Sequence, residues 1–159
     1  MNELILRIGV MGVLATLSMD ILGLFLKYTF KIPPANWTLI GRWFASLPHG
    51  KFFHTDISQS PSIAFETTIG WIAHYAIGIA YAALLLAFTG VDWLQDPTVL
   101  PPLVIGWVTV GAGWFVLQPG MGAGWAASKR ANKWQIRGLN ILAHTIFGLG
   151  LYAGAVLPL

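Results

Sequence analysis

The sequence contains no cysteine and few charged residues. Without cysteine, disulfides, thiolate metal sites and thiol catalysis are excluded. Charged residues make up only 9% of the 159 residues, and 56% are hydrophobic, whereas a soluble domain carries about 25% charged residues. This balance is typical of a chain whose main solvent is lipid, and we expect the lipid bilayer to be its principal partner.

Four apolar runs are long enough to cross a bilayer, which takes about 20 residues. They cover about residues 4–30, 63–88, 99–127 and 138–159. Most prolines stand between these runs, but Pro119 lies inside the third, where we expect a kink. The pattern predicts an all-α integral membrane four-helix bundle made of two helical hairpins. At this length the chain is expected to form a single transmembrane domain over residues 1–159.

Basic residues are concentrated in two of the three loops. Lys31, Arg42 and Lys51 follow the first run, and four more lie in 129–137, whereas the second loop carries Asp92 and Asp96. By the positive-inside rule the first and third loops are cytoplasmic and both termini face the other side. The basic residues flank apolar runs, so they indicate topology and not a nucleic-acid partner.

The first loop is too long for a plain connection and contains a short periodic segment over 36–47. Trp37, Ile40, Phe44 and Leu47 recur at helical spacing, and Asn36 can cap the helix. We therefore predict a short interfacial helix in the first cytoplasmic loop, with its tryptophans at the level of the lipid headgroups.

The second and fourth runs share a faint pattern. His74, Gly78 and Tyr81 of the second run recur as His144, Gly148 and Tyr152 in the fourth. This echo is compatible with two hairpins related by an axis along the membrane normal, although so few residues are weak evidence of duplication.

Several separated blocks resemble a known family. RWFASLPHGKFFHTDI, ETTIGWIAHYAIGIAYAALLL, QPGMGAGWAASK and the closing AHTIFGLGLYAGA are together similar to the bacterial membrane-protein family catalogued as domain of unknown function 2938. The resemblance covers nearly the whole chain. It implies a small, multi-pass protein of the bacterial inner (cytoplasmic) membrane, and it brings no established activity and no catalytic residue.

One polar side chain of each run lies at a similar predicted depth. Asp20, His74, Gln118 and His144 are on the order of 10–16 Å from the cytoplasmic ends at 1.5 Å per residue. Ionisable groups in a membrane normally face the bundle interior, so we predict that these four form one inward-facing ligand- or ion-binding layer. Glu66 would extend this layer toward the cytoplasm.

Imidazole and carboxylate groups inside a membrane are the usual components of proton relays. The sequence therefore favours binding or permeation of a proton, an ion or a small solute, with Arg42, His54 and Asp56 as a cytoplasmic lid. Four helices enclose a narrow path, so transport would be easier in a homo-oligomer or a larger membrane complex. No pattern indicates a nucleophile with its base, and we expect binding in preference to catalysis.

Three alternatives stay open. The polar layer can be purely structural, in a structural or assembly subunit without a ligand site. His74 and His144 can be axial ligands of haem b in an electron carrier, with Gly78 and Gly148 making room for the macrocycle. His74, His144 and Asp20 can instead bind a divalent metal, as in a metal-dependent membrane enzyme.

Overall fold

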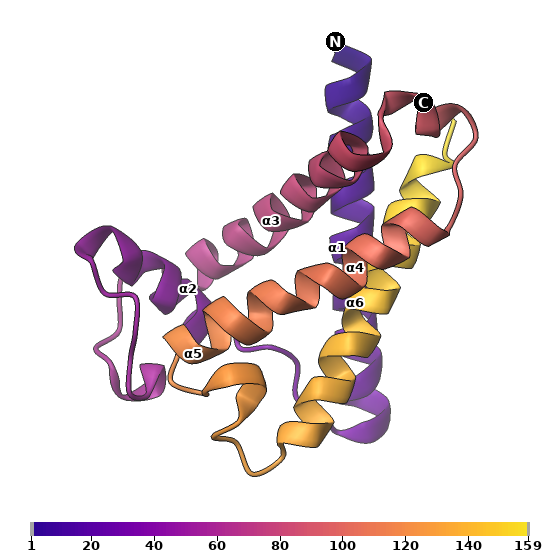
Figure 1. Ribbon diagram of the computed structural model, residues 1–159. Helices are drawn as coiled ribbons and strands as arrows, with labels where there is room; N and C mark the ends of the chain where they lie inside the picture. The colour runs from indigo at the N-terminus through magenta and orange to yellow at the C-terminus, as the bar shows by residue number, and fades with distance from the viewer. Residues whose placement is uncertain (1, 159) are drawn as a thin grey trace. The chain divides into compact units, whose positions relative to one another are not determined.

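The computed structural model describes residues 2–158, which are all-α and contain no strand. Four long helices and one short helix make up most of this part of the chain (Figure 1). The helices are α1 (Asn2–Phe30), α2 (Trp37–Ser46), α3 (Glu66–Thr89), α4 (Leu100–Ala112) with its continuation through the π-helical turn η4 (Gly113–Leu117) and α5 (Gln118–Gly120), and α6 (Lys133–Ala155). Short 3-10 turns occupy the loops: η1 (Leu47–His49), η2 (Ile57–Gln59), η3 (Val91–Gln95) and η5 (Trp125–Ala127).

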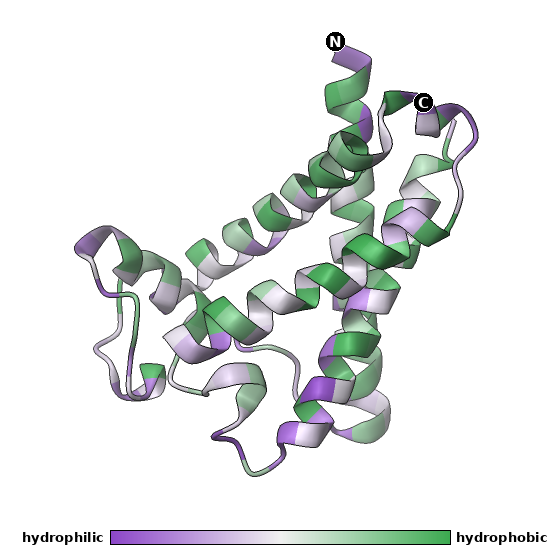
Figure 2. Ribbon diagram, viewed as in Figure 1, coloured by the Kyte–Doolittle hydropathy of each residue, from purple (hydrophilic) through white to green (hydrophobic). Residues whose placement is uncertain are grey.

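The four long helices, 2–30, 66–89, 100–120 and 133–155, are long and apolar enough to cross a membrane. Each exposes large hydrophobic side chains, for example Ile21 (59% exposed), Phe88 (75%), Val108 (68%) and Ile141 (47%). Figure 2 shows the same helices as mainly hydrophobic along their length. Exposed apolar surface of this extent is unfavourable in water. The chain is therefore a multi-pass membrane protein.

The chain divides into two compact units, and parts of all four long helices lie in unit 1, which comprises residues 1–34, 75–109 and 141–159. Its core is an apolar cluster that includes Met11, Ala15, Leu85, Phe147 and Leu151. These residues come from α1, α3 and α6, and Ile105 of α4 belongs to the same cluster. Within this unit the four spans thus pack as a bundle.

Glycines bring the helix backbones of unit 1 into direct contact. A side chain at Gly12 of α1 would overlap Ile79 of α3, and one at Gly148 of α6 would overlap Leu103 of α4. Gly150 of α6 likewise lies against Ala15 of α1. Small residues let membrane helices approach closely, because no hydrophobic effect drives them together within lipid. The contacts pair α1 with α3 and α4 with α6, which are the two predicted hairpins, and Gly150 joins the hairpins through α6 and α1.

Unit 2 comprises residues 35–74 and 110–140. Here α2 crosses the first turns of α3 with no intervening side chains, because a methyl group at Gly41 would overlap the Glu66 carbonyl and one at Gly70 the Trp37 carbonyl. Asn36 caps α2 as predicted, its side chain accepting a hydrogen bond from the Leu39 N–H at 3.1 Å. The fifth helix expected in the first loop is present at 37–46.

The helix ends differ from the sequence estimates for identifiable reasons. The third span ends at Gly120, seven residues before the predicted end, because Gly122 and Gly124 have φ of +89° and +75°, which is incompatible with a right-handed helix. The π-helical turn η4 ends two residues before Pro119. Such a turn relieves the clash between a proline ring and the preceding helical turn. The fourth span begins at Lys133, five residues earlier than predicted.

Candidate functional site

Asp20 lies on α1 in unit 1 and accepts a hydrogen bond from Tyr75 of α3. The Tyr75 hydroxyl donates to Asp20 Oδ2 at 2.8 Å, and both side chains are half-buried. The carboxyl group within this span thus has a polar partner on the neighbouring helix.

His144 of α6 is held against α4 by its Nδ1 atom. This atom lies 3.0 Å from the Gly106 carbonyl oxygen and 3.2 Å from Thr109 Oγ1. A carbonyl cannot donate a hydrogen bond, so Nδ1 carries the proton. These contacts fix the orientation of the His144 ring against α4.

The glycine contacts also define the heights of Asp20 and His144 within unit 1. Met11 lies against Gly154, and Ala15 against Gly150, so α1 and α6 run antiparallel. Asp20 is five residues after Ala15 on α1, and His144 is six residues before Gly150 on α6. Because the helices are antiparallel, both steps lead toward the same end of the pair. At 1.5 Å per residue these steps are about 7.5 and 9 Å. The two side chains therefore originate at similar heights, as an inward-facing layer requires.

Gln118, in unit 2, belongs to a small polar cluster with Trp114 and Asn140. The Trp114 Nε1–H and the Gln118 Nε2 amide both donate to Asn140 Oδ1 at 3.0 Å. An indole N–H only donates, which fixes the orientation of the Asn140 amide and, through it, that of Gln118. Gln118 Oε1 consequently points away from Asn140. Among residues 2–158 it is a buried side-chain oxygen with no hydrogen-bond partner.

His74 lies in unit 2 and stacks on Trp37, the first residue of α2. The ring centroids are 3.9 Å apart with an interplanar angle of 28°, and the Trp71 ring lies 5.9 Å from that of His74. This stacking holds the His74 ring against α2. A contact with α2 was not expected for this residue.

Glu66 and Arg42 form a bidentate ion pair at the start of α3. Arg42 Nε and Nη2 donate to the two Glu66 carboxylate oxygens at 2.8 and 2.9 Å. The side chains are only 11% and 13% exposed. Arg42 Nη1 also donates to the carbonyls of Ser60 at 2.7 Å and Ile57 at 3.3 Å. The hydrogen bond to Glu66 raises the pKa of Arg42. The charged guanidinium thus holds the loop at Ile57 and Ser60 to the start of α3.

The other two residues of the predicted lid also hold the loop. The His54 backbone N–H donates to the Gly120 carbonyl at 2.8 Å, and His54 Nδ1 lies 3.2 Å from the same oxygen. Asp56 accepts hydrogen bonds from the hydroxyl and backbone N–H of Ser58 at 2.8 and 2.9 Å. These bonds lower the pKa of Asp56. Gly120 and Gly122 pack closely against this loop, since side chains there would overlap the Phe52 and Thr55 carbonyls, respectively.

The haem alternative required space for a macrocycle beside Gly78 and Gly148, and the helix packing does not leave this space. The space beside Gly78 is filled by Thr16 and the Gly12 carbonyl of α1, and that beside Gly148 by α4. Neither glycine leaves room for a macrocycle. As for metals, no group of three or more histidine and acidic side chains suited to an ion occurs within residues 2–158. The set Asp20, His74 and His144 stays a prediction.

Sequence reasoning selected the ionisable groups but missed the neutral residues that hold them. Tyr75 and Thr109 were not selected, although each lies on a predicted span. Tyr75 could be identified as the partner of Asp20 only from the register of α1 against α3, which the contact of Gly12 with Ile79 shows. A single sequence does not give this register.

The chain matches the model of one protein family over residues 9–158, and the family is described as a protein of unknown function, DUF2938. Because the match covers nearly the whole sequence, the chain belongs to this family, as the resemblance implied. No curated protein and no solved structure matches it.

Proposed function

We propose that this member of the DUF2938 family binds a proton, a small cation or a small hydrogen-bond-donating solute within its membrane spans. In unit 2, Gln118 would accept from it through Oε1; in unit 1, the predicted site residues Asp20 and His144 would bind a ligand of the same kind. Binding of this kind is the first step of transport, and permeation would follow where several copies or another complex provide a path. The other predicted site residues, Glu66 and His74, would act through Arg42 and Trp37 respectively.

The observation that carries the proposal is the buried Gln118 Oε1 without a hydrogen-bond donor. Leaving a buried carbonyl unsatisfied costs about 1–3 kcal/mol. A bound molecule with an O–H or N–H group, or a cation, removes this penalty. The orientation of Gln118 follows from the Trp114 N–H, because a turned amide would place Gln118 Oε1 against another acceptor, Asn140 Oδ1.

The polar groups of unit 1 support the same class of ligand. Asp20 has acceptor oxygens, and His144 has an imidazole, a group that changes its charge near neutral pH. Protons and cations are therefore favoured over anions. A polar layer with a purely structural role would show the same contacts. The test must therefore measure ion flux and protein stability separately.

The test uses purified protein in liposomes that enclose a pH-sensitive dye, with an imposed pH gradient. We expect Asp20→Asn, His144→Gln and Gln118→Leu each to lower proton or ammonium flux by at least about tenfold, the effect of one charge-assisted contact. Thr145→Val is the matched control, because it removes a neighbouring hydroxyl on α6 that bonds Trp107 instead. Thermal unfolding is measured on every variant. Normal flux in variants that fold would refute the proposal, and lost stability with unchanged flux would assign the layer a structural role.

We also propose that the chain lies in a bacterial inner membrane with both termini periplasmic. The concentration of basic residues at 31–51 and 129–137 supports this orientation. Because the chain has no cysteine, single cysteines can report it directly. In intact spheroplasts a membrane-impermeant maleimide should label Gln95→Cys and leave Lys129→Cys unlabelled. The opposite pattern would invert the topology.

A further inference from the structure

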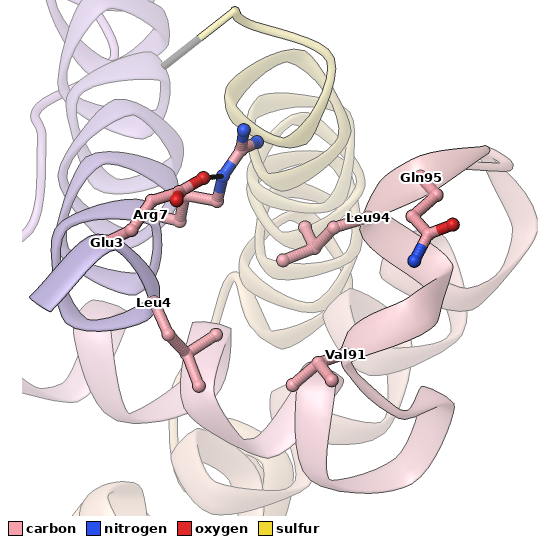
Figure 3. A pocket seen from close by; sticks show the side chains of 6 residues that line it. All are labelled: Glu3, Leu4, Arg7, Val91, Leu94 and Gln95. Carbon is pink, nitrogen blue, oxygen red and sulfur yellow. Dashed lines mark hydrogen bonds and ion pairs between the residues drawn. The ribbon is translucent and has the colours of Figure 1, made fainter. Parts of the chain in front are cut away.

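The arginines of the chain differ in whether they have an acidic partner. Arg42 and Arg7 each form an ion pair with a glutamate, and Figure 3 shows the second pair at an open cavity of about 300 Å³ in unit 1. Arg137 of α6 forms no ion pair with an acidic side chain within residues 2–158. Residues 97–159 contain four basic side chains and no aspartate or glutamate, so the positive charge of this stretch is poorly compensated.

Two contacts within unit 2 hold the Arg137 side chain in place. Its Nε atom donates to the Ala126 carbonyl at 2.8 Å, and its guanidinium carbon lies 4.6 Å from the centre of the Trp134 ring. Stacking on an indole face is favourable for a guanidinium. In the part of the chain that the structure describes, Nη1 and Nη2 donate to no protein acceptor. Arg137 thus presents oriented N–H donors of the kind that bind phosphate oxygens.

Lys133 adds a second positive charge next to Arg137. It precedes Arg137 by four residues on α6, so the two side chains start on the same face of the helix. Lys133 also forms no ion pair with an acidic side chain among residues 2–158. Like charges at this spacing are slightly destabilising. An anion bound by both groups would remove this repulsion.

The two basic residues lie at a membrane surface. Lys133 and Arg137 belong to the first two turns of a helix that is long and apolar enough to cross the bilayer. Trp134 and Trp125 of the same unit are 73% and 67% exposed, and tryptophan in membrane proteins prefers the level of the lipid headgroups. The anionic groups at that level are the phosphates of phospholipids.

We propose that Lys133 and Arg137 form a binding site for the headgroup phosphate of an anionic phospholipid. Arg137 would bind the phosphate oxygens through its Nη donors, and Lys133 would add the attraction of a second cation. Headgroups that also carry an ammonium, such as ethanolamine and choline, are disfavoured, because the ammonium would meet two cations and residues 97–159 offer it no carboxylate. This proposal is independent of ligand binding within the spans.

The test is native mass spectrometry of the delipidated full chain after exposure to vesicles with equal amounts of phosphatidylglycerol, phosphatidylethanolamine and phosphatidylcholine. We expect the wild type to retain phosphatidylglycerol preferentially. Lys133→Gln and Arg137→Gln should each lower the ratio of retained phosphatidylglycerol to phosphatidylethanolamine about fivefold, the effect of one basic residue at a membrane surface. Arg137→Lys keeps the charge but loses the planar set of donors, so it should also lower the ratio.

Lys31→Gln is the matched control, because it removes one exposed positive charge beside a span of unit 1 and should leave the ratio nearly unchanged. An equal fall in Lys31→Gln and Lys133→Gln would indicate diffuse attraction and overturn the site, as would equal retention of the three lipids by the wild type. Displacement of the lipid by an equal concentration of soluble glycerol phosphate would assign the site to free phosphate and overturn the lipid proposal. Circular dichroism checks the folding of each variant, and Lys133→Gln tests the site without removing the Arg137 contact with Ala126.

Discussion

Replacing Arg42 tests whether the loop is held by its ion pair with Glu66. Arg42→Met removes two hydrogen bonds to the carboxylate, at 2.8 and 2.9 Å, and two to the carbonyls of Ser60 and Ile57. Removing one partner of a buried pair costs about 3–5 kcal/mol, because the other charge stays buried without compensation. The pair is 11% and 13% exposed, so we expect a loss near the lower bound, about 3 kcal/mol.

A double-mutant cycle isolates the interaction itself. Glu66→Gln leaves the guanidinium buried without a counter-charge and should cost about 2 kcal/mol or more. In the Arg42→Met background, Glu66→Gln removes the uncompensated carboxylate and should hardly change the free energy of unfolding. We therefore expect a coupling free energy of about 2 kcal/mol.

The assay is unfolding of the purified protein in mixed micelles by increasing sodium dodecyl sulfate, followed by circular dichroism. Arg130→Met is the control, since Arg130 is exposed, and it should change the free energy of unfolding by less than about 0.5 kcal/mol. Single-variant effects that simply add in the double variant would show that the two groups do not stabilise each other, and the clamp would be refuted.

Three further predictions use the same unfolding assay. Gly148→Ala should destabilise by about 1–3 kcal/mol, because the methyl group would overlap α4, whereas Gly138→Ala on the same helix meets nothing within 4 Å and should be neutral or stabilising; equal effects would contradict the packing. Asn36→Ala should cost about 1 kcal/mol by removing the α2 cap, and no loss would show that the cap is unimportant. Asp56 has a lowered pKa because Ser58 donates to it, so its stabilisation is complete above the ordinary value of 3.8 and is lost as the pH falls through the lowered value. Asp56→Asn should remove this part of the acid dependence, and an unchanged pH profile would refute it.

The sequence was sufficient for the spans because their signal is local. Runs of apolar residues identify four helices by length alone, and the spacing of Trp37, Ile40 and Phe44 identified α2. The helix ends depended on backbone geometry instead. Gly122 and Gly124 end the third span through positive φ, and a run of small apolar residues does not show which glycine adopts that conformation.

The candidate site was only partly accessible from the sequence. The depth of a residue in a span can be counted from the end of its helix, and this count predicted similar heights for Asp20 and His144. Partners depend on which helices are neighbours and on their register, so the contacts of Asp20 with Tyr75 and of Gln118 with Asn140 could not be deduced. The ion pair of Arg42 with Glu66 joins residues that had been given separate roles.

The glycine contacts limit how anything can pass through unit 1. Where Gly12 meets α3 and Gly148 meets α4, backbone lies on backbone, and a single added methyl group has no space. Backbone contact this close leaves no space for a water molecule, so neither seam provides a path while the hairpins stay closed. Under the proposed function, a proton or cation captured by a lone copy would need a route other than these two seams, or a hairpin that opens along its glycines, to reach the far side.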